Sequence, residues 1–149
     1  MTDFASDPSR LITGMGAALV DLFADVQDAE LEALGSPKAS MSLIEANQST
    51  DLQKSVSVHT HQPGGSAANS VAGIASLGLA TGFIGKVSDD ALGHVFSDAF
   101  QQLKVAFPSR PETSLPTGHC LVLVTPDAER TMHTVLGASV TTSTADLDD

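Results

Sequence analysis

The hydrophobic and polar positions of the chain form short apolar runs that alternate with amphipathic stretches. Residues 1–10 are a polar lead, and the run that follows over residues 11–21 (LITGMGAALVD) predicts a buried strand. Gly14 and Gly16 interrupt the side chains of this run, which is typical of a strand whose backbone another group approaches closely. We therefore expect the first strand to lie in the middle of a sheet.

The next segments are shorter. Residues 28–34 (DAELEAL) predict a helix that Asp28 caps and that ends at Gly35. Residues 41–44 predict a short strand and residues 45–54 a polar helix. The alternation of residues 55–61 (SVSVHTH) predicts a half-exposed strand.

The middle of the chain has a helical apolar period. Residues 64–78 (GGSAANSVAGIASLG) predict a tightly packed helix of small residues that opens on a glycine pair. Residues 81–87 predict a strand. A helix that Asp89 or Asp90 caps then runs to about Leu103.

The last part of the chain predicts two strands, over residues 117–125 and 129–136, around the turn Pro126-Asp127. Residues 144–149 (TADLDD) predict the start of a capped helix, so that the chain would stop within a domain. The order of strands and helices is typical of an α/β fold with a parallel sheet.

The charge balance restricts the classes of partner. Seven basic against 18 acidic residues give a net charge of −11, which repels nucleic acid and anionic membranes. No apolar run reaches the roughly 20 residues of a membrane span, and the N-terminus lacks a secretory pattern, so we expect a cytoplasmic protein. Cys120 is the single cysteine, which excludes an internal disulfide and favours a buried small side chain.

The strongest candidate for chemistry is the glycine pair Gly64-Gly65 with Asn69 behind it. A glycine pair that opens a helix exposes backbone N–H groups and lets a ligand touch the main chain. An Asn amide both donates to and accepts from a hydroxyl group, which suits polyol recognition. The alternative is a close packing of this helix on a sheet, without a ligand.

These residues carry a resemblance to a known family. The stretch GGSAANSVAGIASLGLATGFIGKVSDDALG is similar to the first signature of the PfkB carbohydrate kinases. The opening ITGMGAALVD and the stretch TGHCLVLVTPDAERTMHTVLGAS resemble further strands of that family, most closely in its adenosine kinase group. The resemblance extends over residues 11–149 in the expected order.

The resemblance implies a ribokinase-like, three-layer α/β/α fold with a small β-sheet lid, of which this chain is the N-terminal part. It implies lid strands within about residues 38–61 and 117–136. Such a lid closes over the sugar and excludes water.

The resemblance also implies roles for individual residues. Asp21 and Asn69 match the residues that hydrogen-bond the hydroxyls of the sugar, and an ionised carboxylate is a strong acceptor for hydroxyls. Gly64 and Gly65 match the close backbone approach, with Ser66 beside them. Without the resemblance, Asp21 would be interpreted as a helix cap or a solvated turn.

Arg130 matches a family position near the phosphate-transfer region, although a surface Arg in a hairpin is the alternative. Two departures from the family pattern leave the substrate open. Ala17 stands where the family often has Asn, and His133 replaces the Asn of the motif RTMNT.

The resemblance implies ATP and Mg²⁺ as cofactors, with a site mostly outside this chain. The family's Gly-Ala-Gly-Asp pattern, whose Asp is the general base, does not occur in the 149 residues, so we predict no catalytic residue here. A phosphate loop with its Lys is also absent from the sequence. We expect the isolated chain to transfer no phosphate and to be marginally stable or to self-associate.

Three functions remain. The first is ATP-dependent phosphorylation of a sugar or nucleoside hydroxyl, with this chain supplying the substrate-binding half. The second is a truncated, non-catalytic fragment that binds a ligand or a partner, and the third is a structural α/β domain. A small molecule is the expected partner, and the family's lids allow a homodimer; the sequence does not distinguish adenosine, ribose, fructose or gluconate-type substrates.

Other polar residues give weaker signals. His59 and His61 share a strand face as metal ligands do, but no third ligand accompanies them and we predict no metal site. Asp89 and Asp90 are explained by helix capping. The remaining histidines have no partner that the sequence identifies: His94, His119 and His133.

Overall fold

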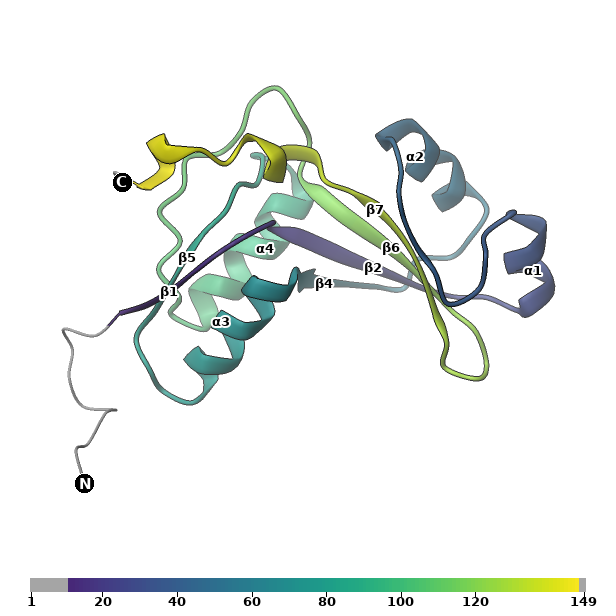
Figure 1. Ribbon diagram of the computed structural model, residues 1–149, viewed down its shortest axis with the longest axis horizontal. Helices are drawn as coiled ribbons and strands as arrows, with labels where there is room; N and C mark the ends of the chain where they lie inside the picture. The colour runs from purple at the N-terminus through teal and green to yellow at the C-terminus, as the bar shows by residue number, and fades with distance from the viewer. Residues whose placement is uncertain (1–10, 148–149) are drawn as a thin grey trace.

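The computed structural model describes residues 11–147 (Figure 1). Its elements in chain order are β1 (Ile12–Met15), β2 (Leu19–Asp25), α1 (Asp28–Ala33), β3 (Met41–Leu43), α2 (Ala46–Lys54), β4 (Thr60–Gly64), α3 (Ser66–Ser76), β5 (Thr81–Ile84), α4 (Ala91–Gln102), β6 (Gly118–Val124), β7 (Arg130–Val135) and two 3-10 turns, η1 (Gly137–Thr141) and η2 (Thr144–Leu147). Figure 1 shows them in two groups along the long axis, with β1, β5, α3 and α4 at one end and the hairpin end of β6 and β7 with α1 and α2 at the other. None of the helices within residues 11–147 is long and apolar enough to cross a membrane.

The first group is built on a small parallel sheet of β1 and β5. Helix α3 packs on both strands. Four phenylalanines fill the space between β5 and α4, with ring centroids 4.4 to 5.9 Å apart: Phe83, Phe96, Phe100 and Phe107. Aromatic pairs in tilted and edge arrangements add to the hydrophobic stabilisation, so this cluster fixes α4 on the sheet.

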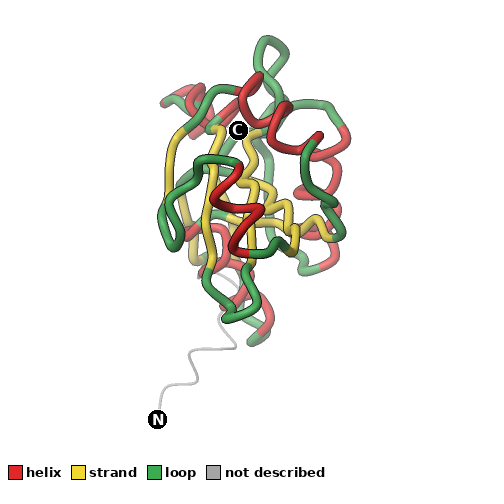
Figure 2. Tube along the Cα trace, turned by 90° about the vertical axis from the view of Figure 1, so that its right-hand side faces the viewer, coloured by secondary structure: helices red, strands yellow, loops and turns green. Residues whose placement is uncertain are grey.

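The second group is a large, five-stranded sheet in the order β3-β7-β6-β2-β4. Its pairing is mixed: β2–β6 and β3–β7 are parallel, whereas β2–β4 and β6–β7 are antiparallel. The antiparallel β6–β7 pair is the hairpin predicted around Pro126-Asp127. The prediction of a parallel sheet is wrong for the β2–β4 pair, because β4 returns to the free edge of β2 in the opposite direction after the segment that contains α1, β3 and α2. Figure 2, which views the molecule from this end, shows a short helix in front of the strands.

The expected first strand over residues 11–21 is two strands. Residues 16–18 form a bend, after which β2 leaves the small sheet and joins the large one. The Gly16 N–H donates to the Ile84 carbonyl at 3.1 Å and so closes the ladder of the small sheet at the bend. The prediction of one buried strand is also wrong for β1, where Ile12 and Met15 are exposed.

The other boundaries agree with the sequence pattern in type and differ in position. The strand expected over residues 55–61 is β4 at Thr60–Gly64, which includes Pro63 and lies at the edge of the sheet, where a strand proline is tolerated. Helix α1 is capped by Gln27 rather than by Asp28. Asp90 caps α4 by accepting from the Gly93 N–H at 2.8 Å, as predicted. Residues 144–147 form a 3-10 turn, and residues 148–149 lie outside the described residues.

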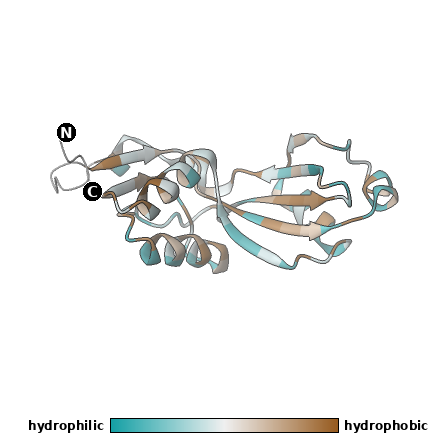
Figure 3. Ribbon diagram, turned by 90° about the horizontal axis from the view of Figure 1, so that it is seen from below, coloured by the Kyte–Doolittle hydropathy of each residue, from teal (hydrophilic) through white to brown (hydrophobic). Residues whose placement is uncertain are grey.

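The two faces of the large sheet differ. Along β2, residues alternate between fully buried and half-buried positions, and Figure 3 shows apolar residues along the inner strands. We name the buried side the helix face, because α1, α2 and their loops cover it. His119 bonds the Ser49 hydroxyl at 2.7 Å and His133 bonds the Ser36 hydroxyl at 2.8 Å on this face.

The sequence identified no partner for these two histidines, and the structure supplies one for each. His94 also has a partner, because its Nε2 lies 2.8 Å from a carboxylate oxygen of Asp89. The partners of His119 and His133 come from distant segments of the chain and fasten the helical cover onto the sheet.

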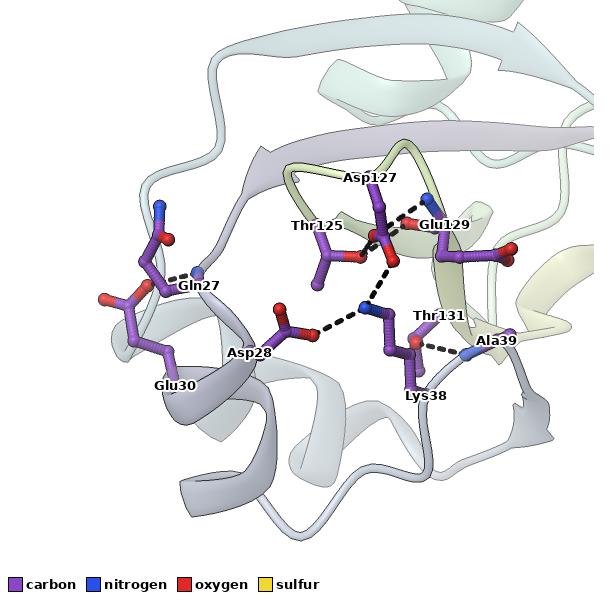
Figure 4. A network of polar contacts seen from close by, with 9 residues as sticks. All are labelled: Gln27, Asp28, Glu30, Lys38, Ala39, Thr125, Asp127, Glu129 and Thr131. Atoms are coloured by element: carbon purple, nitrogen blue, oxygen red, sulfur yellow. Dashed lines mark hydrogen bonds and ion pairs between the residues drawn. The ribbon is translucent and has the colours of Figure 1, made fainter.

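Lys38 ties the far end of the large sheet together (Figure 4). Its ammonium lies 2.6 Å from Asp28 at the start of α1 and 2.7 Å from Asp127 in the β6–β7 turn. The hydrogen bonds from Lys38 and then from the Thr125 hydroxyl lower the pKa of Asp127 to about 2. Three segments that are separate in the sequence therefore meet at one ammonium group.

A second ion pair fixes the end of the described chain. The Lys86 ammonium, which follows β5, bonds the buried Asp146 carboxylate in η2. Asp146 also accepts from the Ser143 N–H at 2.8 Å, so the carboxylate has two kinds of donor. The pair holds residues 137–147 against the end of the small sheet.

Helix α3 begins where two backbones nearly touch. Gly65 caps the helix with φ +101°, and a Cβ at this residue would lie 2.4 Å from the Ala17 carbonyl oxygen. Both the left-handed backbone and the close approach require glycine. Because Gly65 has no side chain, the start of α3 can pack directly against the bend at residues 16–18.

This packing predicts opposite effects for two glycines of one helix. Gly65→Ala should lower the free energy of unfolding by about 1–3 kcal/mol, because alanine is strained at this φ and meets the Ala17 carbonyl. Gly73→Ala, at an exposed interior position with open space around it, should raise it by about 0.5–1 kcal/mol. Urea unfolding at equilibrium measures both, and equal effects at the two positions would contradict the packing.

The buried histidines predict a pH dependence of stability. Burial lowers the pKa of both His119 and His133 below the ordinary value of 6.5. The unfolded chain therefore binds more protons than the folded one below about pH 6.5, and stability falls as the pH falls, by at most about 1.4 kcal/mol per pH unit for each histidine.

Urea unfolding of the wild type and of the double variant His119→Gln/His133→Asn between pH 7.5 and pH 5 tests this. The variant should lose most of the slope. His61→Asn, which changes an exposed histidine, is the control and should keep it. A wild-type stability that does not change over this range would refute the prediction.

Candidate functional site

Asp21 lies in the middle of β2, on the side of the large sheet opposite the helix face. In the sheet it stands beside Cys120 of β6 and Gln62 of β4. Its side chain is half-buried, and burial raises its pKa, whereas the Arg130 guanidinium lowers it. We name this side of the sheet the Asp21 face.

Gly64 lies against the Asp21 carboxylate. A Cβ at Gly64 would lie 2.5–2.6 Å from the carboxyl atoms of Asp21, so no other residue fits without displacing the carboxylate. Gly64 is the last residue of β4, and α3 starts two residues later. The carboxylate is therefore held next to the start of α3.

The other predicted substrate residues lie on the first turn of α3. Ser66 is its first residue and is exposed, and the Asn69 N–H donates to the Gly65 carbonyl at 2.8 Å. The Asn69 side chain is exposed and lines a cleft of about 240 Å³ together with Gln62. The first-turn N–H groups of a helix have no partner within the helix, so this end presents donors to a ligand. The structure thus gathers Asp21, Gly64, Gly65, Ser66 and Asn69 in one region.

Arg130 lies at the start of β7, opposite Val124 of β6. The register places its side chain on the Asp21 face, because Val124 in turn stands beside Asp25 of β2, four residues along the strand from Asp21. The side chain is exposed, and its charge acts on the Asp21 carboxylate. The Asp21 face therefore carries a hydrogen-bond acceptor, the Asp21 carboxylate, at one end and a cation, the Arg130 guanidinium, at the other.

An apolar strip joins these two ends, and the sequence reasoning missed it. The strip consists of residues that the register places on the Asp21 face: Phe23, Val122, Met132, Met41 and Leu43. Met41 and Leu43 are exposed, and Phe23 and Met132 are half-buried. The signal that could have found the strip is the period of two in β7, where Arg130, Met132 and Thr134 alternate with the residues of the helix face.

Cys120 lies in the middle of this face and is buried. Burial raises the pKa of its thiol, and the Thr134 hydroxyl donates to the sulfur at 3.3 Å. A thiol with a raised pKa is a poor nucleophile, which agrees with the predicted role as a small buried side chain.

The weaker metal candidates do not form a site. His59 lies 3.5 Å from Asp25, and His61 stands on β4 opposite Leu22. Within residues 11–147 no three side chains of His, Cys, Asp or Glu come together as metal ligands would.

Comparison with known proteins gives relatives that phosphorylate small molecules. The chain is 40% identical over 62 residues to 5-dehydro-2-deoxygluconokinase of Bacillus anthracis (strain A0248), which is 42% of this chain and 19% of that protein. It matches adenosine kinase of Sinorhizobium meliloti with 38% identity and a TM-score of 0.84, over 91% of this chain and 42% of that one. It also matches a probable sugar kinase of Rhizobium etli CFN 42 with 33% identity and a TM-score of 0.81, over 92% and 43% of the two chains.

The chain thus spans about a fifth of the curated relative and less than half of these solved structures. The structural matches confirm the predicted α/β, ribokinase-like fold class. The model of the pfkB family carbohydrate kinases matches residues 29–149. With this match over most of its length, the chain belongs to the pfkB family of carbohydrate kinases.

Proposed function

We propose that the chain supplies the substrate-binding half of an ATP-dependent kinase that phosphorylates a hydroxyl of a sugar or nucleoside. The observation that carries the proposal is the Asp21 carboxylate, which is half-buried and held against Gly64 at the start of α3. A carboxylate in this setting accepts hydrogen bonds only, and sugar hydroxyls are the donors that match it.

The apolar strip supports a substrate that has a flat or apolar part beside its hydroxyls. Phe23 and Met132 flank the buried Val122, so a ring that lies on the strip covers their exposed atoms. A nucleoside has this combination, with its ribose at Asp21 and its base on the strip. A free sugar would use the polar end alone, so we propose an adenosine-like nucleoside as the first substrate to test and a ribose-like sugar as the second.

The similarity to the Sinorhizobium adenosine kinase supports the nucleoside, and the similarity to 5-dehydro-2-deoxygluconokinase supports a sugar acid. We propose that Arg130 faces the anionic part of a bound phosphate or sugar acid. Segments 38–61 and 117–136 would then act as the lid that covers the substrate and excludes water.

ATP and Mg²⁺ are the cofactors that the family implies. The described residues do not fit them: the Asp21 face has the carboxylates of Asp21 and Asp25 along β2 and the guanidinium of Arg130, and no cluster of three metal-ligating side chains occurs within residues 11–147. We therefore assign neither group to this chain and derive no step through it.

A second candidate is a non-catalytic protein that binds the ligand without chemistry. This candidate needs only the groups that the described residues supply, the Asp21 carboxylate and the start of α3, and it needs no general base. The two candidates share the binding site and differ only in turnover.

Substitution of Asp21 tests the binding site. Asp21→Asn should weaken the binding of adenosine by about 100-fold, because two charge-assisted hydrogen bonds of about 1.5 kcal/mol each are lost. Isothermal titration calorimetry with adenosine, D-ribose and 5-dehydro-2-deoxygluconate measures the affinities. Asp98→Asn, the same change at an exposed position of α4, is the control and should bind as the wild type does.

An ADP-release assay with ATP, Mg²⁺ and the ligand that binds, run on the full product of the native gene rather than on the isolated 149 residues, separates the two candidates. Release of ADP supports the kinase, and binding without ADP release supports the non-catalytic protein. If the wild type binds none of the three ligands, both candidates fail and a structural α/β domain remains.

We also propose a homodimer through the edge of the large sheet. Strand β3 is an edge strand whose Met41 and Leu43 are 58% and 63% exposed, and an uncovered apolar edge favours strand pairing. Light scattering should give twice the chain mass for the wild type and the single mass for Leu43→Lys. Leu77→Lys, at an exposed residue of the other group, is the control, and a monomeric wild type would contradict the dimer.

A further inference from the structure

Gln62 is the side chain that stands directly opposite Asp21. The two residues form a pair in the antiparallel β2–β4 ladder. Opposite residues of such a pair project from the same face, with Cβ atoms about 4.5–5.5 Å apart. Gln62 is exposed on the edge strand, so its amide can reach the group that the carboxylate binds.

Gln62 also shares a cleft with Asn69. This cleft, of about 240 Å³, is lined by residues of β4, α3 and α4: Gln62, Pro63, Asn69, Ala72, Ala99, Phe100 and Leu103. Gln62 and Asn69 are its two hydrogen-bonding side chains. Within residues 11–147 neither amide has a side-chain hydrogen bond to the protein, so both are available to a ligand.

The Asp21 carboxylate and the amides of Gln62 and Asn69 have complementary hydrogen-bonding functions. The Asp21 carboxylate accepts hydrogen bonds from hydroxyls, but it leaves the oxygen of each bound hydroxyl without a donor. An amide supplies that donor through its NH₂ group. A hydroxyl that donates to Asp21 and accepts from Gln62 has both of its functions satisfied, which makes the contact directional.

We propose that Gln62 is a third polar contact to the substrate, beside Asp21 and Asn69, and that it selects ligands with two adjacent hydroxyls. This inference rests on the proposed function. One hydroxyl of the diol lies between Asp21 and Gln62, and its neighbour lies toward Asn69. A ligand that lacks the first hydroxyl leaves the carboxylate and the amide without their partner, and sites built on hydrogen bonds discriminate strongly against such analogues.

The neighbouring residue provides a matched control. His61 is also exposed, but it pairs with Leu22 and so projects toward the helix face. His61→Ala removes a side chain of similar size from the same edge strand. It should not change ligand binding.

The test is calorimetric titration of the wild type, Gln62→Ala and His61→Ala with adenosine, 2′-deoxyadenosine and 3′-deoxyadenosine. Gln62→Ala should weaken adenosine binding about tenfold, which is the loss of one hydrogen bond. It should leave the affinity unchanged for the deoxy analogue that lacks the hydroxyl in question, because the contact is already absent there. Circular dichroism and thermal melting confirm that the exposed substitution leaves the fold intact.

Three results would overturn the proposal. Unchanged adenosine binding by Gln62→Ala would refute the contact and leave the proposed function standing. An equal loss for all three ligands would show that the substitution acts on the whole site rather than on one hydroxyl. Failure of the wild type to bind any of the three, together with failure to bind D-ribose and 5-dehydro-2-deoxygluconate, would refute the proposed function and this inference with it.

Discussion

The close approach at Gly64 and Gly65 is the constraint on which the rest of the site depends. At Gly65 the start of α3 meets the carbonyl of Ala17, and at Gly64 the end of β4 meets the carboxylate of Asp21. At both glycines the approach is so close that a Cβ atom would overlap with the facing carbonyl or carboxylate. As a result, the bend between the small and large sheets, the edge strand β4 and the first turn of α3 share one point, and a carboxylate on the large sheet lies beside the end of a helix on the small one.

The large sheet can leave this carboxylate accessible because its other face, the helix face, packs against the helices and stabilises the sheet. Val20, Leu22 and Ala24 alternate with the residues of the Asp21 face and are buried under the helices. The bonds from His119 and His133 to serines add polar specificity to that packing. A sheet that is anchored on one side can leave its second face half-exposed, which is the arrangement that a ligand needs. The alternation of buried and half-buried residues along β2 therefore explains both the packing of the helix face and the accessibility of the Asp21 face.

Much of this could be predicted from the sequence, because it rests on local signals. The glycine pair predicted the start of α3, and Asp90 predicted the start of α4. Features that depend on distant partners were not predicted. Residues 11–21 are apolar almost throughout, so nothing local shows that the chain changes sheets at Gly16. The serine partners of His119 and His133 lie 70 and 97 residues away in the sequence, and no periodicity identifies them.

Under the proposed function, the charges of the Asp21 face, which are the carboxylates of Asp21 and Asp25 and the guanidinium of Arg130, limit which ligands the site can hold. A neutral nucleoside or sugar meets the Asp21 carboxylate as a hydrogen-bond acceptor and incurs no repulsion. A sugar acid brings a carboxylate of its own. The partial burial of Asp21 disfavours a further negative charge beside it, so the carboxylate of the acid would have to turn toward Arg130. Because Arg130 is exposed at the opposite end of the apolar strip, an acid would have to bridge the length of the strip to gain that contact. The same geometry favours a neutral ligand whose apolar part fills the strip, and it leaves Arg130 free to face a phosphate.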